Sequence, residues 1–143
     1  MKDHIKVAVE ALKDFRARGN YVICIPWDLE AMEIKKTESQ SFGMDEAAYV
    51  REERMRFVVL KVGPGEWRDG IKLALDLHPG DIVVTNVTSS CLRENCSQPR
   101  FIINGQPIFL FDGRMIEHES GDIFGVVGHT ALTEAEELLG ISG

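Results

Sequence analysis

The chain has 143 residues, of which 44% are hydrophobic, and it carries a formal net charge of −7. A chain of this length can bury one core, so we expect a single domain with short appendages. Nucleic-acid partners are disfavoured, because their affinity depends largely on a positive face. No segment approaches the roughly 20 apolar residues that a membrane helix needs, and the amino terminus lacks a signal-peptide core. We therefore expect a cytoplasmic protein without membrane contact.

Residues 1–19 predict a helical extension at the amino terminus. Asp3 is in position to cap the helix, because its carboxylate can accept hydrogen bonds from the first free backbone amides. Gly19 and Asn20 are expected to end it. Apolar side chains recur at spacings of three and four residues and so share one helical face: Ile5, Ala8, Val9, Leu12 and Phe15.

A β-rich run at residues 21–25 predicts the first strand, and Pro26 limits how far its hydrogen-bonded ladder can continue. A second strand is expected at residues 31–35, where apolar and charged side chains alternate. Residues 36–56 are mostly polar and charged. They contain too few apolar groups to hold a core element in place, so we expect an exposed loop there.

Two turns that combine glycine and proline organise the middle of the chain. A strand is expected at residues 56–62, and Gly63-Pro64-Gly65 turns it into a polar excursion that ends at Gly70. His78-Pro79-Gly80-Asp81 matches a type II turn, because glycine takes the required positive φ at low cost. This turn leads into a buried strand at residues 82–85.

The last third of the chain predicts a meander followed by a closing strand. Asn104-Gly105 and Asp112-Gly113 are strong hairpin signals. The closing strand is expected at residues 122–128. Thr133 with Glu136 matches a capping box, so the tail at residues 129–143 should contain a short helix. The two hairpin signals separate three expected antiparallel strands, at residues 101–103, 107–111 and 114–116.

Three of these segments, in this order, resemble the barrel of the co-chaperonin (GroES) family: residues 57–65, 77–85 and 122–128. The resemblance covers residues 20–128 and implies a mainly β protein built as a small antiparallel β-barrel. Helices at residues 1–19 and 129–143 would be additions to the family pattern, and residues 89–118 would hold an inserted meander. The insertion could thicken a ring wall, widen a cavity or offer a separate binding edge, and the sequence leaves these alternatives open.

Members of this family form ring-shaped lids. The resemblance therefore implies a homo-oligomer, a heptamer in the family pattern, that caps a GroEL-type chaperonin in its nucleotide-bound state and assists the folding of client proteins. It implies no cofactor. The departures from the family pattern suit a phage-encoded version that acts in the host cytoplasm. The alternative is a structural β-barrel of a phage virion, such as a capsid-decoration or connector protein, without chaperonin contact.

The loop at residues 36–56 occupies the position of the family's mobile chaperonin-binding loop. By resemblance, its docking tip would be Ser41, Phe42, Gly43 and Met44. A polar tether gives up entropy on binding and keeps each contact weak, while several tips on one ring would act together. The family's pair of glycines followed by an Ile-Val-Leu type tripeptide is absent here. A surface loop or short helix packed on its own barrel therefore fits the same residues equally well.

The resemblance also implies a roof hairpin and a subunit interface. The polar excursion would form the hairpin at the roof of the dome, with its tip at Glu66, Trp67, Arg68 and Asp69. Trp67 would either project there or be buried, which is the commoner fate of a large aromatic side chain. The closing strand would pair with the first strand of the neighbouring subunit, through an interface that includes Tyr21, Ile23, Ile123, Val126 and Val127.

Catalytic and metal-binding patterns are weak throughout the sequence. The four histidines lack the helical spacing of a zinc-protease motif, and no Gly-x-Ser-x-Gly motif occurs. His118 lies between two glutamates, where a solvated strand end is the simpler interpretation. Three cysteines are an odd number, and Cys91 and Cys96 lack further ligands at zinc-site spacing, so we expect reduced thiols. We predict no catalytic residues and no metal site.

Overall fold

The computed structural model describes residues 2–28, 54–88, 100–117 and 121–133. These residues form a mainly β structure with one helix, which confirms the mainly β part of the predicted fold class. In chain order the elements are α1 (Asp3–Ala11), β1 (Tyr21–Pro26), β2 (Arg54–Val62), β3 (Glu66–Arg68), β4 (Ile71–Leu73), β5 (Asp81–Thr88), β6 (Arg100–Ile103), β7 (Gln106–Asp112) and β8 (Ile123–His129).

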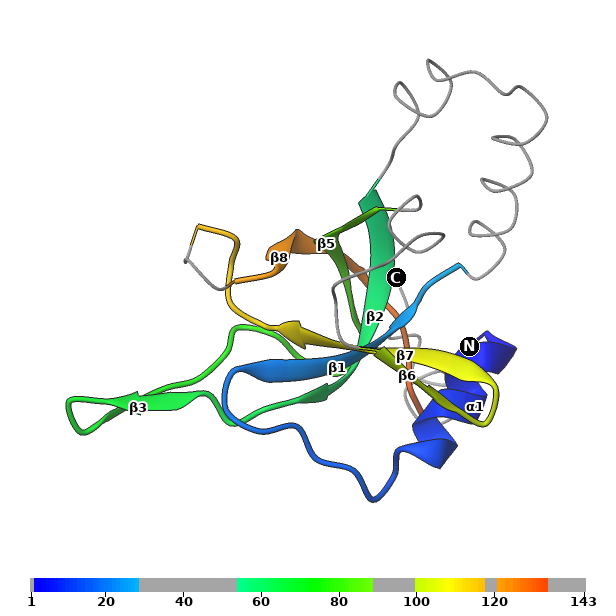
Figure 1. The fold of residues 1–143 in the computed structure, drawn as a ribbon, viewed down its shortest axis with the longest axis horizontal. Helices are drawn as coiled ribbons and strands as arrows, with labels where there is room; N and C mark the ends of the chain where they lie inside the picture. Colours follow the sequence, from blue (N-terminus) through cyan, green and yellow to red (C-terminus); the bar gives the residue numbers. More distant parts are fainter. Residues whose placement is uncertain (1, 29–53, 89–99, 118–120, 134–143) are drawn as a thin grey trace, which may run out of the picture.

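Six strands form one sheet in the order β6-β7-β1-β2-β5-β8, and every pairing between them is antiparallel. The remaining strands, β3 and β4, pair in a separate hairpin. Figure 1 shows the larger sheet strongly twisted. Its two edge strands, β6 and β8, do not pair with each other. The described residues therefore form an open sheet, and the closed barrel that the sequence predicted is not seen in them.

One face of the sheet encloses a core built around three phenylalanine rings, here called the phenylalanine core. Phe57 packs edge-on against Phe109 and Phe111, with ring centroids 5.1 and 4.9 Å apart. The rings of Phe109 and Phe111 stack on each other at 6.0 Å. Other buried members come from β1, β2, β5, β8 and the segment before β5: Val22, Cys24, Met55, Val59, Leu77, Val83, Val87 and Ile123.

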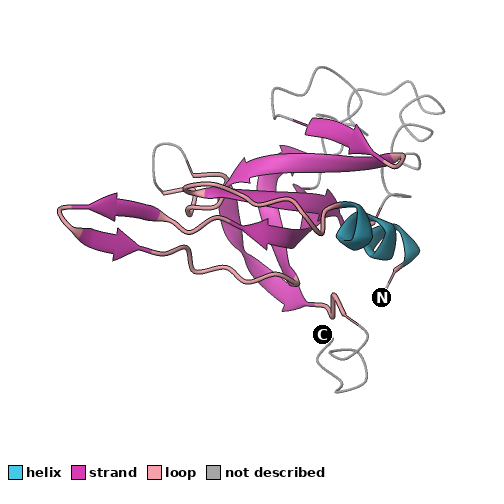
Figure 2. Cartoon of the chain, turned by 90° about the horizontal axis from the view of Figure 1, so that it is seen from below, coloured by secondary structure: helices cyan, strands magenta, loops and turns pink. Residues whose placement is uncertain are grey.

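The other face of the sheet carries a second core, the helix-side core, which α1 covers (Figure 2). Neighbouring residues of a strand point to opposite faces, so Val22 and Cys24 lie in the phenylalanine core while Ile23 and Ile25 lie in the helix-side core. This continuous apolar pattern is expected of a strand that is buried on both faces. The helix-side core contains Ile5, Ala8, Leu12, Ile23, Ile25, Val58, Leu60, Ile82, Ile108 and Leu132.

The helix is shorter than the sequence predicted. Its N-cap is Lys2, and no side-chain hydrogen bond caps it, so the predicted capping role of Asp3 is wrong and Asp3 lies in the first turn. The helix ends at Ala11, with Leu12 as its C-cap. Phe15 lies beyond it and is 47% exposed. Phe15 therefore does not join Ile5, Ala8 and Leu12 in the helix-side core.

Two predicted turns are confirmed by their backbone geometry. Asn104 and Gly105 both have positive φ, at 49° and 78°, as a type I′ turn between β6 and β7 requires. Gly80 has φ 99°, and the amide of Asp81 donates to the carbonyl of His78 at 3.0 Å, as a type II turn requires.

The third predicted strand of the meander, at residues 114–116, is not formed. Only an isolated parallel bridge joins Met115 to Ile123. Asp112 and Gly113 lack the positive φ that a type I′ turn needs. The Asp112 carboxylate instead accepts bonds from the backbone and guanidinium of Arg114, at 2.7 to 3.0 Å. These contacts bend the chain away from the β6-β7 hairpin and toward the start of β8.

The carboxyl-terminal boundary of the predicted loop at residues 36–56 also differs. β2 begins at Arg54, two residues before the predicted strand, and Met55 is buried in the phenylalanine core. Because the side chain of Met55 packs in this core, the strand begins within a stretch of sequence that is otherwise mostly polar. The strand predicted at residues 31–35, the rest of the loop and the helix predicted in the tail lie outside the described residues.

Candidate functional site

The β3-β4 hairpin projects from the body of the molecule (Figures 1 and 2). Its register pairs Trp67 with Lys72 and Arg68 with Ile71. Trp67 is 71% exposed and Ile71 is 64% exposed, so both aromatic and aliphatic surface is presented at the tip. The predicted roof residues therefore lie together on one exposed hairpin, and Trp67 is not part of a core.

Glycines fix both ends of this hairpin. At its tip, Asp69 and Gly70 have positive φ, 52° and 79°, which makes a type I′ turn. At its base, the amide of Gly65 donates to the carbonyl of Gly19 at 2.8 Å, and the amide of Gly63 donates to Tyr21 at 2.9 Å. The hairpin is thus attached to the segment before β1 through backbone contacts that leave little room for side chains.

The second exposed feature is the outer edge of β8. β5 pairs with one side of β8, from Ile123 to His129. At the beginning of the other side, Ile123 exchanges backbone hydrogen bonds with Arg114 and Ile116 at 3.1 and 2.8 Å. Val126 is 50% exposed and Val127 is 58% exposed. Among the described residues, this stretch is an apolar strand edge of the kind that another chain can extend.

The predicted subunit interface is placed only in part at the surface. Tyr21, Val126 and Val127 are exposed, whereas Ile23 and Ile123 lie in the two cores. β1 is paired with β2 on one side and with β7 on the other. In this arrangement β1 offers no free edge to the β8 strand of a neighbouring subunit, because β7 of the same chain already pairs with that side of β1.

A carboxylate network holds the beginning of β8 in place. The side chain of Asp122 accepts from the amide of Asp112 at 2.7 Å and from Asn86 at 3.3 Å. The hydrogen bond to Asp112 raises the pKa of Arg114 above its ordinary value. Asp112 thereby connects β7, the segment after it and β8, which is a structural role.

A second polar cluster joins the turn before β5 to the end of β8. Asp81 lies between two histidines: its carboxylate is 3.2 Å from Nδ1 of His129, and it accepts from the amide of His78 at 2.9 Å. His129 lies 48 residues from Asp81 in the sequence, so no local motif predicts the contact between them. In the described parts of the chain, no group of three acidic, histidine or cysteine side chains is arranged to hold a metal ion.

The base of the long loop is anchored to α1. The amide of Trp27 donates to the carbonyl of Arg56 at 2.9 Å, and this hydrogen bond joins the segment that enters the loop to the strand that leaves it. Lys2 donates to the carbonyl of Trp27 at 3.0 Å and lies over its ring, 4.2 Å from the centroid. His4 donates to Pro26 at 2.8 Å. The predicted tip at residues 41–44 lies outside the described residues, as do Cys91, Cys96 and His118.

Cys24 is fully buried in the phenylalanine core, and burial raises the pKa of its thiol far above the ordinary value. Because the thiolate is the reactive form, iodoacetamide at pH 8 should alkylate Cys24 only in the unfolded chain. The unfolded chain ionises this thiol at about pH 8.5, so the contribution of Cys24 to folding stability should fall as the pH rises beyond that value.

Mass spectrometry of the peptide that contains Cys24, after alkylation with and without urea, would check this expectation. Equal alkylation rates in the folded and unfolded protein would show that the core opens far more readily than its packing indicates.

Neither the family models nor the curated proteins contain a match to this chain.

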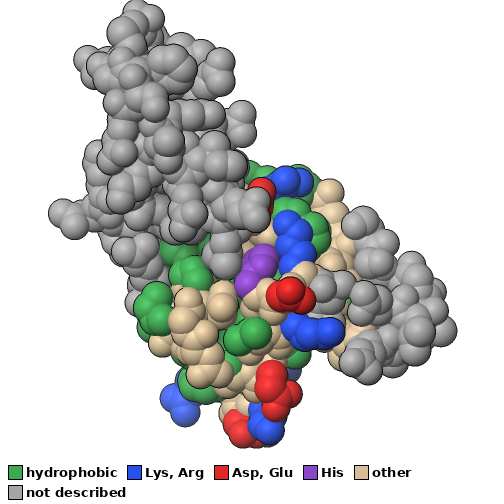
Figure 3. Space-filling view, turned by 90° about the vertical axis from the view of Figure 1, so that its right-hand side faces the viewer, with side chains coloured by type: hydrophobic (Ala, Val, Ile, Leu, Met, Phe, Trp, Pro, Cys, Tyr) green, Lys and Arg blue, Asp and Glu red, His purple; other side chains and the backbone are tan. Residues whose placement is uncertain are grey.

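No helix in the described residues is long and apolar enough to cross a membrane. On the side of the molecule that carries α1, basic and acidic side chains are interspersed (Figure 3).

Proposed function

We propose that the protein is a divergent co-chaperonin: a subunit of a homo-oligomeric ring that caps a GroEL-type chaperonin and assists client folding in the cytoplasm. The observation that carries the proposal is the β3-β4 hairpin, which follows a Gly-Pro-Gly turn and projects from an antiparallel sheet with Trp67 and Ile71 exposed. A hairpin of this kind would form the roof of the dome. Its place between β2 and β5 agrees with the order of segments in the sequence resemblance.

The exposed edge of β8 supports the oligomeric part of the proposal. Val126 and Val127 present apolar surface on a strand whose outer side is open over most of its length among the described residues. Burial of such an edge against another subunit supplies main-chain hydrogen bonds and removes a site of aggregation. We propose that the sheet is of the GroES-like type and that the open side of β8 takes part in the contact between neighbouring subunits of the ring.

Native mass spectrometry of the full chain, alone and with a GroEL-type chaperonin plus ADP, tests the proposal. We expect a ring that joins the chaperonin only when nucleotide is present. Replacing Phe42 and Met44 with serine should abolish this association while the ring persists, because these residues form the proposed docking tip. Trp67→Ser is the matched control, since it removes an exposed aromatic side chain from the hairpin and should leave chaperonin binding unchanged.

Two results would contradict the proposal. A monomer at all accessible concentrations would exclude a ring. A ring that ignores every chaperonin offered, including that of its own host, would favour the structural virion protein, which uses the same exposed edges without a chaperonin partner.

A further inference from the structure

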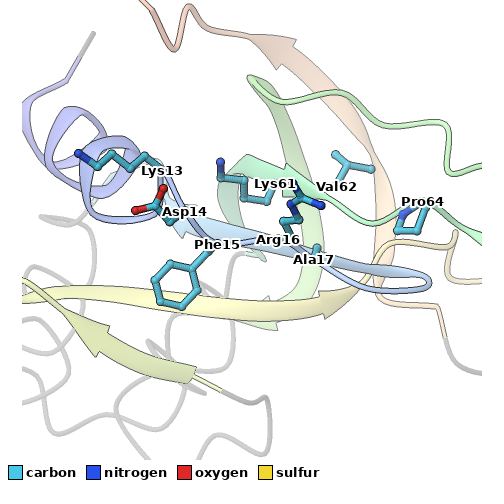
Figure 4. A pocket seen from close by; sticks show the side chains of 8 residues that line it. All are labelled: Lys13, Asp14, Phe15, Arg16, Ala17, Lys61, Val62 and Pro64. Atoms are coloured by element: carbon cyan, nitrogen blue, oxygen red, sulfur yellow. The ribbon is translucent and has the colours of Figure 1, made fainter.

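Two hollows on the surface carry opposite charge, and no residue lines both. The first, here called the basic hollow, has a volume of about 590 Å³ and lies between the segment after α1 and the end of β2. Figure 4 shows Lys13, Asp14 and Phe15 on one side of it and Lys61 and Val62 on the other. Arg16 also lines it, so three cationic side chains face one carboxylate.

Lys61 reaches this hollow because of a β-bulge. In β2, Phe57 and Val59 point into the phenylalanine core, so strict alternation would place position 61 in that core as well. The register between β1 and β2 shifts at Leu60: Cys24 is opposite Val59, whereas Ile23 is opposite Lys61. Lys61 therefore lies on the same face of the sheet as Ile23, beside the helix-side core. Bulges commonly redirect a side chain in this way near functional sites.

The basic hollow combines charge that is unpaired among the described residues with exposed apolar surface. Lys13 forms an ion pair with Glu10 at 3.2 Å, but Arg16 and Lys61 have no ion pair with any described residue. Phe15 is half exposed and Val62 is partly buried. A complementary surface would therefore present carboxylates next to apolar side chains.

The second hollow, here called the acidic hollow, has this composition. Its volume is about 390 Å³, and it lies between the segment before β5, the segment after β7 and the open side of β8. Asp76 and Glu117 line it, are both exposed and have no ion pair with any described residue. Apolar surface comes from Leu75, Met115 and Val126.

The one cation in the acidic hollow does not offset these carboxylates. Arg114 lines the hollow, but its guanidinium is bound to Asp112 at 2.7 and 2.9 Å. The charge of Arg114 is therefore balanced by Asp112, which leaves Asp76 and Glu117 as the unbalanced charges. The acidic hollow also includes Val126 and so continues the exposed edge of β8.

We propose that the basic hollow of one copy docks against the acidic hollow of the next copy in a head-to-tail contact. Copies of a chain with a net charge of −7 repel each other, so a stable contact needs a place where unlike charges meet. The two hollows supply that place, with apolar side chains on both sides to bury. Because the two surfaces differ, the contact is heterologous, and it forms a ring when the rotation between successive copies closes. The inference rests on the ring in the proposed function.

Charge reversal tests this contact by sedimentation velocity of the full chain at several concentrations. We expect the variant Arg16→Glu/Lys61→Glu to raise the dissociation constant of the assembly about tenfold or more, because like charges then face each other. Asp76→Lys/Glu117→Lys should have the same effect from the other side. Combining all four substitutions exchanges the two charges, keeps the net charge at −7, and should restore assembly to within roughly threefold of the native constant.

The control variant Lys6→Glu/Lys72→Glu changes the net charge by the same amount as Arg16→Glu/Lys61→Glu. Both of its sites are exposed and lie outside the two hollows. It should assemble far better than the hollow variants, and circular dichroism should show that every variant is folded. Hollow variants that assemble like this control, or a fourfold variant that stays dissociated, would overturn the inference.

Chaperonin binding separates this inference from the proposed function. Charge-reversed chains that still form the ring and bind the chaperonin would refute only the contact between hollows. A ring that dissociates on charge reversal, recovers in the fourfold variant and ignores the chaperonin would refute only the co-chaperonin proposal.

Discussion

Replacing Phe57 with alanine should lower the free energy of unfolding by about 3–5 kcal/mol, the usual cost of truncating a buried aromatic side chain. Phe57 is fully buried and contacts both other rings of the phenylalanine core, at interplanar angles of 67° and 72°. Edge-to-face pairs of this kind stabilise a core beyond the area that they bury. The substitution also leaves a cavity beside the rings of β7, a strand that β1 separates from β2 in the sheet.

Urea denaturation at one fixed protein concentration would measure this loss, because assembly contributes to apparent stability. Phe101→Ala is the matched control. Phe101 is 38% exposed on the edge strand β6, so its truncation should cost about 1 kcal/mol or less. Equal losses for the two variants would mean that the three-ring cluster does not dominate the core.

Local turn chemistry accounts for most of what could be predicted from the sequence. Asn104-Gly105 and His78 to Asp81 form the turns expected of them, because glycine or asparagine at a positive φ determines these turns within four residues. The strands on either side are short and rich in β-branched residues, so their positions follow from the turns. The β-rich run at residues 21–25 correctly predicts β1, and the structure adds that this strand is buried on both faces.

The errors arise where a distant residue decides the local structure. Asp112-Gly113 has the sequence of a hairpin turn, but the amide of Asp112 is bound by the carboxylate of Asp122, which a sequence pattern does not pair with it. The interface at β1 stays a prediction, but β1 is already paired on both sides within the chain, with β2 and β7. The β6-β7 hairpin, which the sequence identified, adds to the free side of β1, and nothing in its residues indicates where it docks.

The candidate site was predicted in outline only. The position of the β3-β4 hairpin followed from Gly63-Pro64-Gly65, while the exposure of Trp67 required the structure. The basic hollow could not be predicted, because alternation along β2 assigns Lys61 to the core face. One extra residue at Leu60 reverses that assignment, and a bulge of this kind has no reliable sequence signal.

Replacing Gly65 with alanine should lower the free energy of unfolding by about 3 kcal/mol and loosen the β3-β4 hairpin. Gly65 has φ 90°, which costs an alanine about 1–2 kcal/mol. A Cβ atom there would lie 2.1 Å from the carbonyl oxygen of Leu73 and 2.8 Å from the Cα of Ala74. Both contacts are with backbone, so β4 would have to move, at a further cost of about 1–3 kcal/mol.

Gly70→Ala separates the two contributions. Gly70 has φ 79° at the tip of the same hairpin, but a Cβ atom there meets nothing within 4 Å. It should therefore show only the conformational cost of about 1–2 kcal/mol. Urea denaturation gives both values, and hydrogen exchange of the amides at residues 66–73 reports the hairpin itself. Faster exchange in Gly65→Ala than in Gly70→Ala would locate the added cost at the junction with β4. Equal free energies of unfolding for the two variants would contradict the prediction, because they would show that the backbone at the base of the hairpin accommodates the Cβ atom at no extra cost.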